Sequence, residues 1–266
     1  MYAFTYHRPA TVRQAAGLLT KHDDAKLLAG GHTLIPTMKL RLAGPPHIVD
    51  LSKVEGLSGI ELTGRSLTIG AMTRHNDVAT SAIVQQNLPA LAALAGQIGD
   101  PAVRHMGTIG GSVANNDPNA DYPAACLGLG ATIVTNKRRI KADEFFKGLF
   151  ETALEPSEII TKVIFPLPKK AGYVKFPNPA SRYALVGVFV SKRGSEIRVA
   201  VTGAGANGVF RVPSFEEALK KRFGAKALEG MTIPADGMGG DIHGSAEYRA
   251  HLVGVLARRA VAAATA

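Results

Sequence analysis

The chain has 266 residues and a formal net charge of +10, with 31 Lys and Arg against 21 Asp and Glu. Its single cysteine, Cys126, excludes an intramolecular disulfide and any four-cysteine zinc or iron–sulfur site within this chain. No apolar run reaches the roughly 20 residues of a membrane span, and the first residues lack a signal-peptide layout, so we expect a cytoplasmic protein without a transmembrane segment.

The positive charge is spread over several short clusters, such as Lys137-Arg138-Arg139 and Arg258-Arg259. Tryptophan is absent, and aromatic residues are not interleaved with the basic ones, so no base-stacking platform is visible. We predict solvated surface charge and no nucleic-acid partner. An anionic ligand or an acidic partner would account for part of the excess.

The first predicted element is a helix that starts near Thr11. Thr11 and Gln14 have the spacing of a capping box, and the helix extends to about His22. Cys126 lies in a later apolar run and is predicted to be a core residue. Three elements follow the first helix: a buried strand over 25–29 ended by Gly30-Gly31, a helix over 34–42 ended by Gly44-Pro45-Pro46, and a strand over 47–51.

The middle of the chain mixes strands and helices. Alternating apolar residues predict a hairpin over 59–71 with its turn at Gly64-Arg65. The further predicted elements are helices over 74–81, 88–98 and 122–129, two strands around Asn136-Lys137, and a strand over 158–165. A long glycine-containing loop, 107–123, separates the second and third of these helices.

Pro166, Pro168 and Gly172 mark the most plausible domain boundary. Beyond them the pattern predicts antiparallel strands joined by tight turns. Two helices follow, one capped by Ser214 to Glu217 and ending near Phe223, and a last one after Gly244-Ser245. The fold class is therefore α+β.

Two glycine pairs, Gly30-Gly31 and Gly110-Gly111, each lie beside hydroxyl residues. Neither matches the P-loop or the common dinucleotide fingerprint. Consecutive glycines still allow several backbone amides to approach one anion, and a helix after Thr33 would point its positive end at the same anion. Two such loops suit a ligand with two phosphates; two ordinary turns are the alternative.

Four stretches, LLAGGHTLIPTMKLRL, GTIGGSVANNDPNADYPAA, KFPNPASRYALVGV and GDIHGSAEYRAHLVGVLARRAV, together resemble the FAD-binding medium subunit of the molybdenum hydroxylases. The carbon monoxide dehydrogenase branch is the most similar, and the xanthine dehydrogenase FAD subunits are related. The resemblance implies a two-lobed FAD-binding domain of the PCMH (vanillyl-alcohol oxidase-like) type and a smaller α+β C-terminal domain with an antiparallel sheet. The implied ranges are 1–170 for the first domain, with lobes of about 1–57 and 58–170, and 171–266 for the second.

The same resemblance implies non-covalent FAD extended between the lobes, with both glycine loops at its pyrophosphate and adjoining sugar groups. Asp121 would accept from a cofactor hydroxyl, Lys175 would contact FAD, and Ile160 would lie on a strand that passes it. No catalytic residue and no metal ligand is implied in this chain. The residues placed at the cofactor are Ala29, Gly30, Gly31, His32, Thr33, Thr108, Ile109, Gly110, Gly111, Ser112, Asp121, Ile160 and Lys175.

Several of these residues have a structural alternative. His32 is expected to satisfy a nearby backbone carbonyl rather than to take part in proton chemistry, and we expect no covalent bond between His32 and FAD. Asp121 also reads as a helix N-cap. Ile98 stands where xanthine-oxidising relatives carry an aromatic residue against the flavin, and Tyr183, beside Arg182, is either near the flavin or a strand residue.

The resemblance also implies the role of the chain. Partner subunits would carry the molybdenum cofactor and two [2Fe–2S] clusters, and this medium subunit would pass electrons from FAD to an external acceptor: NAD, quinone or oxygen. The expected assembly joins a large, a medium and a small subunit, and these heterotrimers would pair into a dimer. The alternatives are a nucleotide-binding or scaffold module without redox turnover, and a free-standing flavin reductase.

Overall fold

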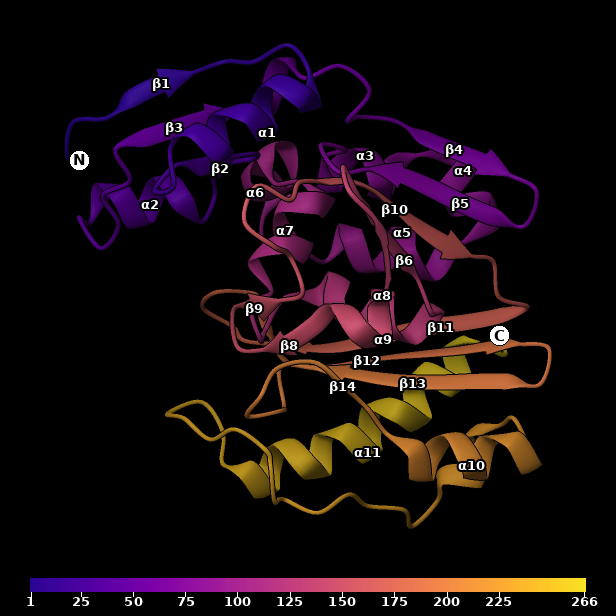
Figure 1. Cartoon of the computed structure of the whole chain (residues 1–266). Helices are drawn as coiled ribbons and strands as arrows, with labels where there is room; N and C mark the ends of the chain where they lie inside the picture. Colours follow the sequence, from indigo (N-terminus) through magenta and orange to yellow (C-terminus); the bar gives the residue numbers. More distant parts are fainter.

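The computed structural model describes all residues, 1–266. Figure 1 shows three groups of elements that follow one another along the chain: a small N-terminal lobe, a helix-rich middle part, and a C-terminal part built on an antiparallel sheet. This mixture confirms the α+β class. None of the helices combines the length and the apolar character that crossing a membrane requires.

The N-terminal lobe is a three-stranded parallel sheet in the order β1-β3-β2. Helix α1 covers the sheet, and the Thr11 hydroxyl caps it by accepting a bond from the Gln14 amide, as the capping box predicts. The lobe has a small core of seven buried residues, of which Ile159 comes from the middle part. Its elements are β1 (Thr5–His7), α1 (Val12–Lys21), β2 (Lys26–Leu28), α2 (Leu34–Lys39), β3 (His47–Asp50) and a short 3₁₀ turn (Leu51–Lys53).

The middle part has a five-stranded antiparallel sheet in the order β4-β5-β10-β6-β7, packed against helices around the largest core of the molecule. Cys126 is fully buried in that core, as predicted, and burial raises the pKa of its thiol. The strands are β4 (Ile60–Thr63), β5 (Ser66–Gly70), β6 (Thr132–Thr135), β7 (Arg139–Lys141) and β10 (Ile160–Pro166), and β8 (Phe146–Gly148) pairs separately with β9 (Glu151–Thr152). The helices are α3 (His75–Thr80), α4 (Ala82–Asn87), α5 (Pro89–Gly96), α6 (Pro101–Met106), α7 (Ile109–Asn115), α8 (Asp121–Leu129) and α9 (Ala142–Phe145).

The C-terminal sheet, in the order β11-β12-β13-β14, is covered on both faces. Helix α8 of the middle part packs on one face, where the Ser191 hydroxyl donates to the Gly128 carbonyl; α11 packs on the other. Burial on both faces explains why β12 is an almost unbroken apolar run. The elements are β11 (Lys170–Pro177), β12 (Ala184–Arg193), β13 (Glu196–Thr202), β14 (Phe210–Arg211), α10 (Pro213–Lys221), a 3₁₀ turn (Ala225–Leu228) and α11 (Ala246–Ala263).

The structure departs from the predicted elements at several points. Strand β1 and helices α4 and α6 were not predicted, and α7 occupies much of the expected 107–123 loop. Helix α2 ends at Lys39 rather than at 42. The capping box at Ser214 is wrong: α10 begins at Pro213, whose fixed φ favours the first helical position, and its N-cap Val212 makes no side-chain bond.

Candidate functional site

A cavity of about 1130 Å³ lies where the N-terminal lobe meets the middle part. It is larger than the usual ligand pocket of roughly 300–1,000 Å³. Both glycine loops line it, together with the first residues of α8 and β10 and the loops around Ser157 and Arg182. All the residues predicted at the cofactor line this cavity, except Ile109 and Lys175.

The first glycine loop leaves a row of backbone amides without partners. None of the amide groups from Ala29 to Leu34 donates a hydrogen bond within the chain. Gly31 has φ +76°, a left-handed conformation that glycine adopts without strain. The Thr33 side chain makes no capping bond to α2, so its hydroxyl is also unengaged. This loop therefore has the donors that an anionic ligand requires.

The two loops are held side by side by close backbone packing. A Cβ on Gly30 would lie 2.3 Å from the Met106 carbonyl oxygen and 2.7 Å from Gly107 Cα. A Cβ on Gly111 would lie 3.5 Å from the Cβ of Ala29. Gly30 therefore allows the close contact between the loops and also lines the cavity. The contact between the loops was not predicted from the sequence.

The second loop differs from the expectation of converging free amides, because its donors are already used. The Ile109 amide donates to the Thr73 carbonyl, the Gly110 amide to the Ala71 carbonyl, and the Gly111 amide to the Thr108 hydroxyl. Ile109 is fully buried and does not reach the cavity. The second loop thus shapes the wall of the cavity more than it supplies backbone donors.

Gly110 is required by packing. A Cβ on Gly110 would lie 2.5 Å from the Cβ of Ala71 and 2.7 Å from its carbonyl oxygen, distances that a side chain cannot occupy. At Gly111 the nearest atom would be the Thr108 hydroxyl oxygen, at 2.9 Å, and the next the Cβ of Ala29, at 3.5 Å, so no backbone atom blocks this position. The two adjacent glycines therefore have different roles.

Asp121 forms a buried ion pair at the cavity wall. Lys175 Nζ donates to Asp121 Oδ2 and to the Gln97 carbonyl, both at 3.0 Å, and the Tyr173 hydroxyl donates to Asp121 Oδ1. The Lys175 side chain is 1% exposed and the Asp121 side chain 3%. Burial raises the pKa of Asp121, and the adjacent ammonium and hydroxyl oppose that rise.

This arrangement corrects the reading of Asp121 as an N-cap. Asp121 is the first residue of α8, and the N-cap position belongs to Ala120, which makes no side-chain bond. The carboxylate instead accepts from Lys175 and Tyr173, two residues of β11. Lys175 is therefore one step removed from the cavity, behind Asp121.

His32 also differs from its expected role, because its side chain is exposed at the cavity and makes no hydrogen bond to a backbone carbonyl. A second histidine, His75, lies in the wall and was not singled out from the sequence. It is 4% exposed, and burial lowers its pKa to about 4, so the ring is neutral at pH 7. A lone histidine in a polar stretch gives no signal that would have identified it.

Backbone strain gathers around the same cavity. Phe150, Ser157 and Arg182 have φ values of 56°, 62° and 61°, and all three line the cavity. A left-handed conformation is uncommon for residues other than glycine and is typical of functional sites. Tyr183 and Ile98 line the cavity as well. No sequence pattern indicates left-handed Phe150 or Ser157, so these positions could not have been predicted.

Comparison with known proteins gives a consistent result. Residues 2–168 match the family described as "FAD binding domain in molybdopterin dehydrogenase". The chain is 37% identical to the carbon monoxide dehydrogenase medium chain of Hydrogenophaga pseudoflava, over 99% of this chain and 97% of that one. It is 36% identical to the nicotine 6-hydroxylase medium subunit of Paenarthrobacter nicotinovorans, over 99% and 98%.

Solved structures agree with the sequence matches. A chain of the Hydrogenophaga pseudoflava carbon monoxide dehydrogenase superimposes with a TM-score of 0.87 at 37% identity, covering 99% of this chain and 98% of that one. A chain of quinoline 2-oxidoreductase from Pseudomonas putida 86 gives a TM-score of 0.86 at 28% identity, with 99% and 97% coverage. The match therefore extends over the whole chain.

Proposed function

Because this chain belongs to the FAD-binding medium subunits of the molybdenum hydroxylases, we propose that FAD binds in the cavity between its two glycine loops. The chain is the flavoprotein subunit of such an enzyme, an FAD-dependent oxidoreductase subunit. FAD, when bound, supplies the redox chemistry by accepting electrons and passing them to an external acceptor. The chain itself contributes binding, orientation and electrostatics.

The single observation that carries the proposal is the row of free amides from Ala29 to Leu34 at the cavity wall. These donors suit the pyrophosphate of FAD, and the Thr33 hydroxyl adds another. Ser112 lines the cavity from the second loop, and Arg182 brings a cation to the wall. The cavity is also large enough for an extended dinucleotide, being larger than ordinary ligand pockets.

The remaining wall residues have supporting roles in this proposal. Asp121, held by Lys175, presents a carboxylate edge that can accept from a cofactor hydroxyl. Ile98 and Ile160 offer apolar surface to the flavin ring. His32 is exposed and unengaged, and we propose that it contacts FAD without a covalent bond.

Flavin titration tests this proposal. The flavin-free chain is titrated with FAD and, separately, with FMN, and binding is followed by calorimetry. We expect one FAD per chain and binding at least tenfold weaker for FMN, which lacks the second phosphate and the adenosine. Equal affinity for the two flavins would contradict a site built around the pyrophosphate.

The chain works within a multisubunit enzyme, as its relatives, a medium chain and a medium subunit, indicate. Its single cysteine cannot hold a four-cysteine cluster. In this proposal the clusters and the molybdenum cofactor lie on partner subunits. We propose a heterotrimer of large, medium and small subunits that pairs into a dimer. Co-expression with both partners and size-exclusion chromatography test this, and separate elution of a folded, flavin-loaded chain would overturn it.

We also propose a domain boundary near residue 170. The family match ends at residue 168, and β11 begins at Lys170. Residues 1–170, with lobes of about 1–57 and 58–170, would hold FAD, and 171–266 would form the C-terminal domain. The packing of α8 on the C-terminal sheet would join these two domains.

A further inference from the structure

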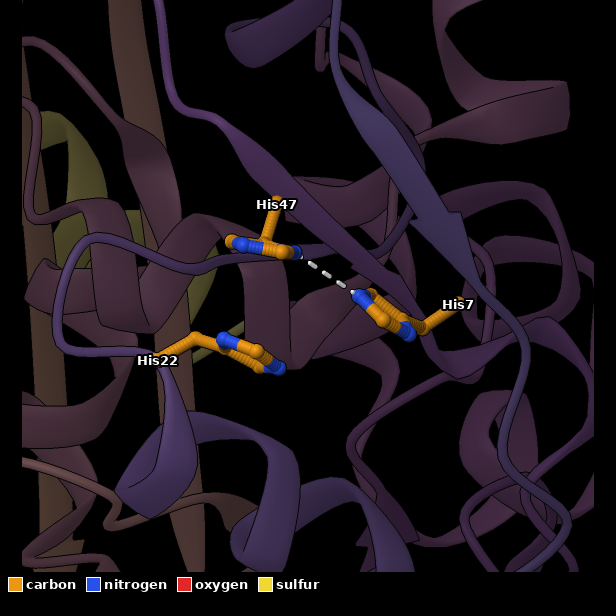
Figure 2. A group of neighbouring side chains, drawn as sticks. All are labelled: His7, His22 and His47. Atoms are coloured by element: carbon orange, nitrogen blue, oxygen red, sulfur yellow. Dashed lines mark hydrogen bonds between the residues drawn. The ribbon is translucent and has the colours of Figure 1, made fainter.

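Three histidines from separate segments meet in the N-terminal lobe, outside the cavity. Figure 2 shows His7, His22 and His47 with their rings together. Each is partly buried, and one ring nitrogen from each lies within 4.8 Å of those of the other two. None of the three lines the cavity, so the proposed FAD site does not use this group.

The fold brings these rings together. His7 ends β1 and His47 begins β3, and in the parallel pairing His7 lies opposite Val49 while Thr5 lies opposite His47. Residues two apart on a strand share a face, so both histidines lie on the same face of the sheet. His22 follows the last residue of α1, which covers the sheet, and stacks on His47 with centroids 3.8 Å apart.

The hydrogen bonding of the three rings is incomplete. Their only hydrogen bond is the one between His7 Nε2 and His47 Nδ1, at 3.0 Å. No carbonyl or carboxylate engages any of the rings. Because all three are only partly buried, the ring nitrogens outside the His7–His47 bond are open to a ligand from solvent.

We propose that His7, His22 and His47 bind one divalent transition-metal ion of the zinc type. Imidazole nitrogen suits Zn²⁺, Cu²⁺ and Ni²⁺. With Zn–N bonds of 2.0–2.1 Å, tetrahedral geometry places neighbouring nitrogens about 3.4 Å apart. The His7–His47 pair already approaches that spacing. The His22 ring, which stacks on His47, would have to turn so that one of its nitrogens points at the ion. Water would occupy the fourth position.

Such an ion would join three segments of a lobe that contributes only six residues to its small core. It would link β1, the end of α1 and the start of β3. His22 also directly precedes Asp23, which lines the cavity and leads into β2 and the first glycine loop. The expected consequence is a more stable N-terminal lobe.

Zinc binding to the tag-free full chain tests the proposal. After dialysis against a chelator, calorimetry should show one Zn²⁺ per chain. At a hundredfold excess over Kd, the melting temperature should rise by about 5–10 °C. Co²⁺ used as a probe should give the intense visible bands of four-coordinate cobalt rather than the weak bands of the octahedral aquo ion.

Matched variants decide whether these three histidines are the ligands. His22→Ala removes one ligand at a partly exposed helix end and should weaken Zn²⁺ binding at least tenfold and abolish the cobalt bands. His251→Ala, an exposed position on α11, should bind like the parent chain. Equal Zn²⁺ affinity in His22→Ala and the parent, or no Zn²⁺ binding by the folded parent, would overturn the proposal.

Discussion

Gly110 and Gly111 are neighbours in the chain, yet the atoms around them differ. Gly110 faces Ala71, whereas Gly111 faces the hydroxyl of Thr108 and, beyond it, Ala29 of the other loop. From the sequence both glycines had the same two explanations, the approach of a ligand or an ordinary turn. In the structure Gly110 is needed for packing, whereas Gly111 borders the space that is available to a ligand.

Gly111→Val should weaken FAD binding at least tenfold while the chain still folds, because the side chain would enter the gap between the loops. Gly110→Ala should instead lower the free energy of unfolding by about 1–3 kcal/mol through overpacking against Ala71. Circular dichroism and flavin titration measure the two effects. Full FAD affinity in a folded Gly111→Val variant would contradict the proposed site.

The buried ion pair between Lys175 and Asp121 is expected to stabilise the fold. Lys175→Met would leave the Asp121 carboxylate buried without its cation, and breaking such a pair costs about 3–5 kcal/mol. Urea unfolding of the flavin-free chain should show this loss. The double variant Asp121→Asn with Lys175→Met should recover part of it, because no buried charge remains.

A purely cofactor-binding role for Lys175 makes the opposite prediction. In that case the flavin-free Lys175→Met chain would be as stable as the parent, and only FAD affinity would fall. The resemblance placed Lys175 at FAD, whereas its contacts place it behind Asp121. Burial and pairing of this kind have no sequence signature, since β11 and α8 are far apart in the chain.

At the level of the element, the segment before β10 forms part of the cavity wall. Leu154, Ser157 and Ile159 line the cavity, and buried Glu158 anchors the segment. Glu158 accepts from Arg138 Nε at 2.9 Å, from the Thr135 hydroxyl at 2.7 Å and from the Glu155 amide at 2.9 Å. The Glu158 carboxylate therefore helps to fix this segment, together with the Asn136 side chain, which accepts from the Ile159 amide at 2.8 Å.

These bonds, that from Arg138 above all, lower the pKa of Glu158 to about 2. A depressed carboxyl pKa stabilises the fold above its unfolded value of about 4.5, and this stabilisation is lost as the pH falls towards 2. The amount is at most about 3 kcal/mol. Glu158→Gln should be less stable than the parent at pH 6.

The difference in unfolding free energy between the parent and Glu158→Gln isolates this contribution, because His75 and other groups titrate equally in both. The difference should shrink between about pH 4.5 and pH 2 when it is measured by urea unfolding. A constant difference over that range would show that the carboxylate charge does not anchor the segment.

Elements with strong local signals were predicted well. The 59–71 hairpin, the strands near 25–29 and 47–51, and the last helix all lie where the pattern places them. Helix α7 was missed because glycines usually indicate a loop, whereas here the Thr108 cap and close packing on Ala71 stabilise a helix. Helices α4 and α6 have six residues each, too few to show a helical repeat of apolar residues in the sequence.

On the scale of the whole molecule, three cores are joined by buried interfaces. The C-terminal sheet shares the core of the middle part through Tyr173, Phe189 and Ala200. A Cβ on Gly172 would lie 2.2 Å from the Ala260 carbonyl oxygen, so α11 also packs closely on β11. The fold class could be predicted from the order of helices and strands along the chain. The cavity between the N-terminal lobe and the middle part could not, because it depends on packing between residues that are far apart in the sequence.

Acid precipitation of the flavin-loaded chain tests whether the cavity holds FAD without a covalent bond. The precipitated protein is removed, and the flavin in the supernatant is identified by mass and quantified by absorbance. We expect one FAD per chain in the supernatant. Flavin that stays with the pellet, FMN in place of FAD, or a folded chain that retains no flavin would contradict it.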